Sequence, residues 1–135
     1  MKLEGTLSRE LLARATSLLP GAVIFKHSDR FTSGMPDASV SWGRTAWLEV
    51  KVSPCGESVR PHKNWGLQLL TAMRLERATG LCWFVVYMER RGSKLIHIVR
   101  PRDMGASGAW SQSATIIVGH DHDSVVEFIR GALKP

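Results

Sequence analysis

The stretch DASVSWGRTAWLEVKV, residues 37–52, decides how this chain folds. The Gly43-Arg44 pair near its middle is typical of the turn of a β-hairpin. Alternating side chains on both sides of that pair predict one strand over 37–42 and a second over 45–52. In a tight hairpin the start of the first strand meets the end of the second, so residues distant in sequence come together.

The second strand of this hairpin carries an unusual pair of charged residues, Glu49 and Lys51. A strand has a period of two, so both side chains point to the same face, together with Trp47. The opposite face is apolar and consists of Ala46, Leu48 and Val50. A carboxylate and an ammonium are unusual on a buried sheet face. The Glu-x-Lys pair is therefore either a solvent-exposed strand edge or part of a functional site.

Periodicity in the rest of the chain predicts three helices and four more strands. The helices are expected over 8–19, 63–79 and 124–133. The strands are expected over 22–25, 81–88, 94–99 and 114–118. The run 81–88 is almost continuously apolar, which is typical of a central strand buried on both faces. This order predicts one α/β domain over 1–135, with a mixed sheet flanked by helices and an extra C-terminal strand and helix.

Capping residues set the predicted ends of these helices. Ser8 is a suitable N-cap for the first helix, and Ser124 with Glu127 makes a capping box for the last. Gly80 is the natural end of the middle helix. The apolar side of that middle helix is expected to consist of Leu67, Leu70, Met73 and Leu75.

Composition indicates an ordinary globular domain with a nucleic-acid partner. No apolar run reaches the roughly 18 residues of a membrane helix. The N-terminal stretch 1–10 is polar and unlike a signal peptide, so we expect a soluble cytoplasmic protein with no membrane partner. The net charge of +6 favours nucleic acid, because Lys and Arg displace the counterions condensed on phosphates. Cys55 and Cys82 are expected to be reduced thiols, without a zinc site or a disulfide.

The hairpin brings together the residue types that phosphodiester hydrolysis needs. Asp37 begins the first strand and Glu49 lies late in the second, so their carboxylates can converge on one ion. Mg²⁺ prefers oxygen ligands and typically takes one or two carboxylates together with waters and substrate phosphates. Lys51 can add positive charge beside the phosphorus and help to orient the attacking water. The alternative is a surface Glu-Lys pair and an Asp that caps a turn.

Two motifs and one helical residue give the chain a resemblance to known nucleases. The runs SGMPD at 33–37 and WLEVK at 47–51, with Gln68 in the following helix, resemble the PD-(D/E)xK nuclease superfamily. They also resemble the virus-type replication-repair nuclease (VRR-NUC) family and the archaeal-type Holliday junction resolvases. The resemblance covers roughly residues 8–88 and implies a restriction-endonuclease-like α-β-β-β-α-β core.

The resemblance implies a role for each matching residue. Asp37 and Glu49 would ligate Mg²⁺, for which Mn²⁺ could substitute, and the backbone carbonyl of Val50 would be a third ligand. Lys51 would position and activate the water and offset charge in the transition state. Gln68 would hydrogen-bond near the site or to the substrate backbone.

Two other acidic positions are candidates for metal binding. These families often add an acidic residue from the first helix, and Glu10 occupies a matching place. A Glu in a first helical turn is also favoured by the helix dipole alone. The tract His-Asp-His-Asp at 120–123 could chelate a metal, or it could cap the helix that follows.

Basic residues around the predicted site are candidates for contact with DNA. Those expected to touch the phosphate backbone are Arg30, Arg60, His62, Lys63 and Arg74. His27 and Asp29 lie in the same loop as Arg30, which could equally be a solvated loop. Trp65 follows the basic group Arg60, His62 and Lys63. Arg77 continues the basic residues along the helix after Arg74.

The resemblance further implies the kind of nuclease. We expect a Mg²⁺-dependent endonuclease that acts on branched DNA as a homodimer, most specifically a Holliday junction resolvase from a phage or mobile element in a bacterial cell. One alternative is a restriction-like or non-specific DNase. The other is a non-catalytic basic DNA-binding protein on a nuclease fold.

Overall fold

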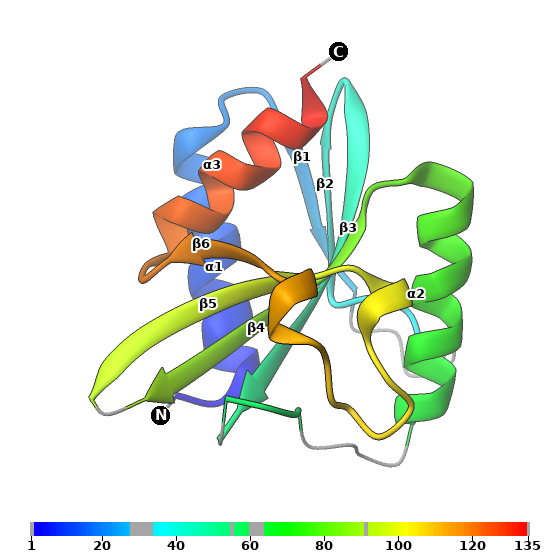
Figure 1. The fold of residues 1–135 in the computed structure, drawn as a ribbon. Coiled ribbons are helices and arrows are strands. Elements are labelled where there is room, and N and C mark those ends of the chain that lie inside the picture. Colours follow the sequence, from blue (N-terminus) through cyan, green and yellow to red (C-terminus); the bar gives the residue numbers. More distant parts are fainter. Residues whose placement is uncertain (1, 28–33, 55, 60–63, 91, 135) are drawn as a thin grey trace.

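The computed structural model describes residues 2–27, 34–54, 56–59, 64–90 and 92–134 (Figure 1). Its helices are α1 (Glu4–Leu18), α2 (Trp65–Thr79) and α3 (His122–Leu133), with short 3₁₀ helices η1 (Pro101–Asp103) and η2 (Gln112–Ala114). Its strands are β1 (Val23–Lys26), β2 (Ala38–Trp42), β3 (Arg44–Ser53), β4 (Cys82–Arg90), β5 (Ser93–Val99) and β6 (Ile116–Gly119). The predicted α/β class is confirmed, and each predicted helix and strand has a counterpart.

The six strands form one mixed sheet in the order β1-β2-β3-β4-β5-β6. Only β3 and β4 pair in parallel among these strands, and the other neighbours are antiparallel. A parallel pair needs a crossover, and α2 supplies it between β3 and β4. Figure 1 shows α2 on one side of the sheet, away from α1 and α3.

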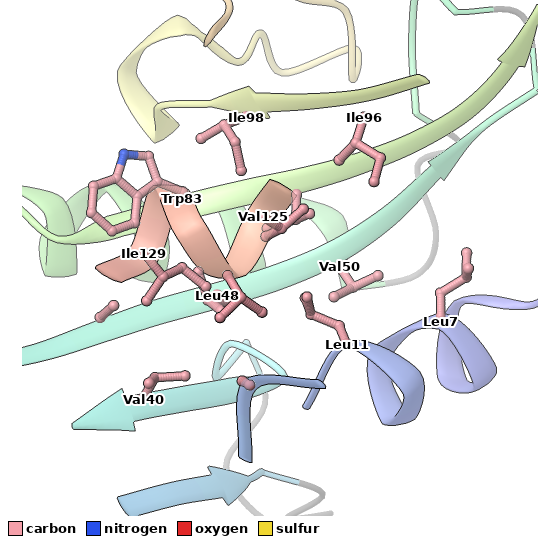
Figure 2. Packing of buried hydrophobic residues seen from close by; sticks show 14 of the residues in the cluster. Leu7, Leu11, Val40, Leu48, Val50, Trp83, Ile96, Ile98, Val125 and Ile129 are labelled. Carbon is pink, nitrogen blue, oxygen red and sulfur yellow. The ribbon is translucent and has the colours of Figure 1, made fainter. Parts of the chain in front are cut away.

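The larger hydrophobic core fills the space between the sheet and the pair α1 and α3. Leu7 and Leu11 of α1 meet Val125 and Ile129 of α3 over the apolar face of the sheet (Figure 2). The sheet contributes Val40, Leu48, Val50, Trp83, Ile96 and Ile98. The predicted apolar face of β3 is thus the one that packs against these two helices.

A second, smaller core lies under α2 and corrects the predicted orientation of that helix. The buried residues of α2 are Trp65, Leu69 and Ala72. Three residues of the predicted apolar side are exposed instead: Leu67, Leu70 and Met73. Apolar residues lie on several sides of α2, so periodicity alone does not predict which side is buried. Packing against β4 determines it, through residues such as Phe84 in the same cluster.

Two predicted N-terminal helix caps are wrong. Helix α1 begins at Glu4, and Ser8 is a buried residue inside it, because the helix continues upstream to bury Leu7. Helix α3 is capped by Asp121, whose side chain accepts from the Ser124 backbone N–H at 2.9 Å. The capping box expected from Ser124 therefore does not form. Gly80 ends α2 in the left-handed conformation, as predicted. Within the described residues, no helix has the length and apolar character needed to cross a membrane.

Candidate active site

The candidate site lies at one end of β3, where this strand runs past its neighbour. Strand β2 starts at Ala38, opposite Leu48, but β3 continues to Ser53. Acidic side chains meet the backbone N–H groups of this overhang. The Val50 N–H donates to Asp37 Oδ2 at 2.9 Å, and the Val52 N–H donates to Glu4 Oε1 at 3.3 Å. Two carboxylates from different elements therefore line the same strand edge.

Asp37 and Glu49 come together at this edge, as the hairpin geometry predicts. The Asp37 backbone N–H donates to Glu49 Oε2 at 3.0 Å. Glu49 is only 3% exposed and Lys51 is fully buried. The Glu-x-Lys pair is therefore not a solvent-exposed strand edge. That alternative from the sequence is excluded.

Gly34 holds the segment before Asp37 close to α2. Its φ is +88°, and a Cβ there would lie 2.8 Å from Leu67 Cγ and 3.0 Å from the Leu67 carbonyl oxygen. A side chain would thus be strained and would collide with the helix. The glycine of the SGMPD run lets the chain pass this close to α2 and enter β2 with Asp37 at its start.

Helix α2 supplies the surroundings of Lys51. The Lys51 ammonium donates to Gln68 Oε1 at 2.8 Å and lies 3.7 Å from Glu49 Oε1. It also lies 5.4 Å from the centre of the Trp65 ring, within the range of a cation–π contact. Gln68 and Trp65 both belong to the first turn of α2. Gln68, which the resemblance implies to hydrogen-bond near the site or to the substrate backbone, is thus placed beside Lys51.

Burial controls the charge of the two carboxyl groups. Burial and, next, the charge of Asp37 raise the pKa of Glu49 to about 8, against the opposing effect of Lys51. Burial also raises the pKa of Asp37, while the hydrogen bond from Val50 and the charge of Lys51 oppose it. In the metal-free protein this pair thus resists carrying two negative charges at neutral pH. A bound cation would favour the ionised form.

The oxygen ligands at this edge fit Mg²⁺ chemistry. Mg²⁺ usually takes one or two carboxylates and keeps several waters. Asp37 and Glu49 supply such a pair, and Glu4 lies near enough to raise the pKa of both. Across the parts of the chain that the structure describes, no three His, Cys, Asp or Glu side chains form a ready metal cage. The site therefore suits a cation whose remaining ligands are water and substrate oxygens.

Glu10 does not lie at this site. Its carboxylate accepts from Lys2 Nζ at 2.7 Å and pairs with His122 Nε2 at 3.0 Å. These two hydrogen bonds lower its pKa. Glu4 is the acidic residue that α1 brings to β3, about 9 Å further along the helix axis by the 1.5 Å rise per residue. Glu4 was not predicted because the helix was expected to begin at Ser8. The available signal for the earlier start was Glu4 itself, an acidic residue just before the apolar periodic run.

Most of the predicted DNA contacts, and one of the two cysteines, lie outside the described residues. Arg30, Arg60, His62 and Lys63 lie outside the described residues, as do Asp29 and Cys55. Arg74 is exposed on α2, as a DNA contact requires, and Arg77 is exposed beside it. Cys82 is a buried free thiol, and burial raises its pKa to about 12.

The tract 120–123 takes part in capping and packing. Asp121 caps α3, and Asp123 binds the Arg14 guanidinium at 2.7 Å. His122 joins Tyr87 to Glu10 through hydrogen bonds of 2.9 and 3.0 Å, along the wall of a cavity of about 590 Å³. These contacts favour the helix-capping interpretation of the tract over metal chelation.

No protein-family model matches this chain, and comparison with curated proteins gives no match.

Proposed function

We propose that this protein is a Mg²⁺-dependent nuclease of the PD-(D/E)xK type, which hydrolyses phosphodiester bonds in DNA. One observation carries the proposal: a fully buried lysine is held by a glutamine beside one buried and one half-buried carboxyl group, at the edge of a strand. The residues are Asp37, Glu49, Lys51 and Gln68. The basic net charge of +6 suits a polyanionic substrate.

Stability alone does not explain why the chain buries this charged cluster. Removing charges from water is costly, and well-packed apolar residues often replace a buried ion pair without loss of stability. The chain nevertheless buries Glu49 and Lys51 completely or nearly so. Strongly perturbed carboxyl groups beside a specific charged partner are typical of functional sites. This combination supports a chemical role for the cluster.

The chain's own residues would divide the work as follows. Asp37, Glu49 and the Val50 carbonyl would hold the ion, with Glu4 acting directly or through water. When bound, the ion would offset phosphate charge and acidify water. Lys51 would place its positive charge beside the attacked phosphorus and orient the water. Gln68 is a positioning residue, because its amide oxygen accepts from the Lys51 ammonium at 2.8 Å.

On the basis of the sequence resemblance, we propose a homodimer that cuts branched DNA in the manner of a Holliday junction resolvase. The test is a cleavage panel of four-way junctions, flaps, splayed arms and linear duplex with Mg²⁺ or Mn²⁺. We expect cleavage of branched substrates and its loss in EDTA or in the Asp37→Asn variant, which keeps an acceptor for Val50.

Each alternative predicts a different result from the same panel. Sequence-dependent cutting of linear duplex would instead indicate a restriction-like enzyme. Binding without cleavage, equal in wild type and Asp37→Asn, would indicate a non-catalytic DNA-binding protein. Failure to cut every substrate with either metal would contradict the proposal.

The two acids of α1 provide a matched pair of variants. Glu4→Gln should lower the initial cleavage rate by roughly 10- to 100-fold, the usual effect of losing a supporting partner at a metal site. The amide can still accept from the Val52 N–H, so the strand edge is kept. Glu10→Gln should change the rate by less than about twofold, because Glu10 contacts Lys2 and His122 instead. The opposite ranking would contradict the assignment of Glu4 to the site.

A further inference from the structure

A set of three rings lies beside the candidate site, on the side of the sheet that carries Glu49 and Lys51. Phe25 pairs with Ser39 across β1 and β2, and Ser39 pairs with Trp47 across β2 and β3. His27 lies between the two larger rings: its centroid is 6.5 Å from that of Phe25 and 5.5 Å from that of Trp47. The His27 and Trp47 rings are stacked, with 25° between their planes. We call Phe25, His27 and Trp47 the aromatic platform.

Two contacts fix His27 of the aromatic platform beside the start of β2, next to Asp37. The His27 backbone N–H donates to the Asp37 carbonyl at 2.7 Å. The His27 Nε2 shares a hydrogen bond of 2.9 Å with the Ser39 hydroxyl, which holds the ring in place. Trp47 precedes Glu49 by two residues on β3 and therefore shares its face. A ligand lying on the rings would thus border the candidate active site.

Part of the aromatic platform is open to solvent. Helix α2 packs on β4, through Trp65 and Phe84, whose rings are 5.5 Å apart. It leaves Phe25 58% exposed on the edge strand β1. The adjacent Lys26, whose side chain belongs to the opposite face of β1, is also exposed, and its charge acts on Asp37. An exposed ring, a stacked pair and a nearby cation are the features that single-stranded nucleic acid uses, through base stacking and phosphate attraction.

We propose that the aromatic platform stacks an unpaired base next to the phosphate that is cut. This inference rests on the proposed nuclease function and specifies its substrate class. The bases of continuous duplex are stacked on each other and cannot lie on protein rings without being unstacked. The substrate would therefore be DNA with single-stranded nucleotides adjacent to the cleavage position, as in a flap, a splayed arm or an opened junction. The order of positions on the sheet favours this occupant, since the rings and Glu49 lie on neighbouring strands of the same sheet face, next to Asp37.

Binding without cleavage tests the aromatic platform directly. A single-stranded oligodeoxynucleotide containing 2-aminopurine is titrated with wild type in EDTA, where stacking on a ring quenches the fluorescence of the base. Phe25→Ala should weaken binding at least about fivefold, the lower end of the effect of losing one stacking ring. Phe25→Trp should restore binding and quenching, whereas Phe25→Leu should not. Binding of linear duplex should change by less than about twofold.

A matched control separates stacking from general loss of apolar surface. Ile116 is also an exposed apolar residue, 39% exposed, on the opposite edge strand β6. Ile116→Ala should leave binding of both oligonucleotides unchanged. Equal loss of single-stranded and duplex binding in Phe25→Ala would overturn the inference. So would unchanged binding, or a change in oligomeric state by sedimentation without a change in DNA binding.

Failure of this inference differs from failure of the proposed function. If wild type cuts DNA but Phe25→Ala binds single strands normally, the aromatic platform is wrong and the nuclease stands. If no substrate is cut but Phe25→Ala loses single-strand binding and quenching, the nuclease is wrong and the stacking surface stands.

Discussion

Replacing Lys51 with Met is expected to lower the cleavage rate by roughly a hundred- to a thousandfold, as for other preorganised groups that stabilise a transition state. Methionine fills a similar volume and removes only the charge and its hydrogen bonds. The ammonium lies 2.8 Å from Gln68 Oε1 and 3.7 Å from Glu49 Oε1, so its position is fixed before substrate arrives. Such preorganisation is what makes a charge effective at a reacting centre.

The same variant should keep its affinity for Mn²⁺. Lys51 is a cation and would repel a bound metal ion, so its removal should leave binding unchanged or tighter in calorimetric titration. Asp37→Asn should lose both cleavage and metal binding, because it removes a ligand. Lys94→Met, on the exposed part of β5, is the control and should keep wild-type activity. Loss of metal binding in Lys51→Met would refute the role given to this lysine, and retained cleavage would refute the proposed mechanism.

Replacing Glu49 with Gln is expected to stabilise the metal-free protein at high pH while abolishing cleavage. Burial raises the pKa of Glu49 to about 8 from its ordinary value of 4.5, so the folded chain binds this proton more tightly than the unfolded chain. The associated stability is present below pH 4.5 and is lost as the pH rises towards 8. Gln carries no such proton, so its stability should not fall over that window.

Urea denaturation in EDTA at pH 5, 7 and 9 measures this difference. At pH 9 the free energy of unfolding of Glu49→Gln should exceed that of wild type by roughly 2–4 kcal/mol. At pH 5 the two proteins should nearly agree. Mn²⁺ should then stabilise wild type and not the variant, because a ligand that binds only the folded state raises its stability. Glu127→Gln, a 62% exposed side chain on α3, should match wild type at every pH. A difference that is the same at all three pH values would show that Glu49 does not ionise in this way.

Local signals in the sequence were enough to predict much of the fold. The alternation of 45–52 placed Glu49 and Lys51 on one face, because the period of a strand is a local property of the backbone. The apolar run 81–88 predicted the central strand, and Gly80 predicted the end of α2. The hairpin turn at Gly43 brought the ends of its two strands together, so the meeting of Asp37 with Glu49 followed from the sequence as well.

Other features depended on contacts between distant elements. The acid that α1 delivers to β3 is Glu4 because the helix begins early, and its contact with the Val52 N–H depends on how α1 packs on the sheet. The buried side of α2 was set by the sheet beneath it, since an apolar residue favours burial equally on either side of the helix.

The sequence by itself therefore determined which residues share a strand face and where the chain turns, because both follow from backbone geometry over a few residues. Only the tertiary structure decided that Lys51 is fully buried against Gln68 and Trp65, and that Phe25 of the aromatic platform stays exposed. Burial depends on what packs from elsewhere in the chain, and the position of α2 over β4 settles both.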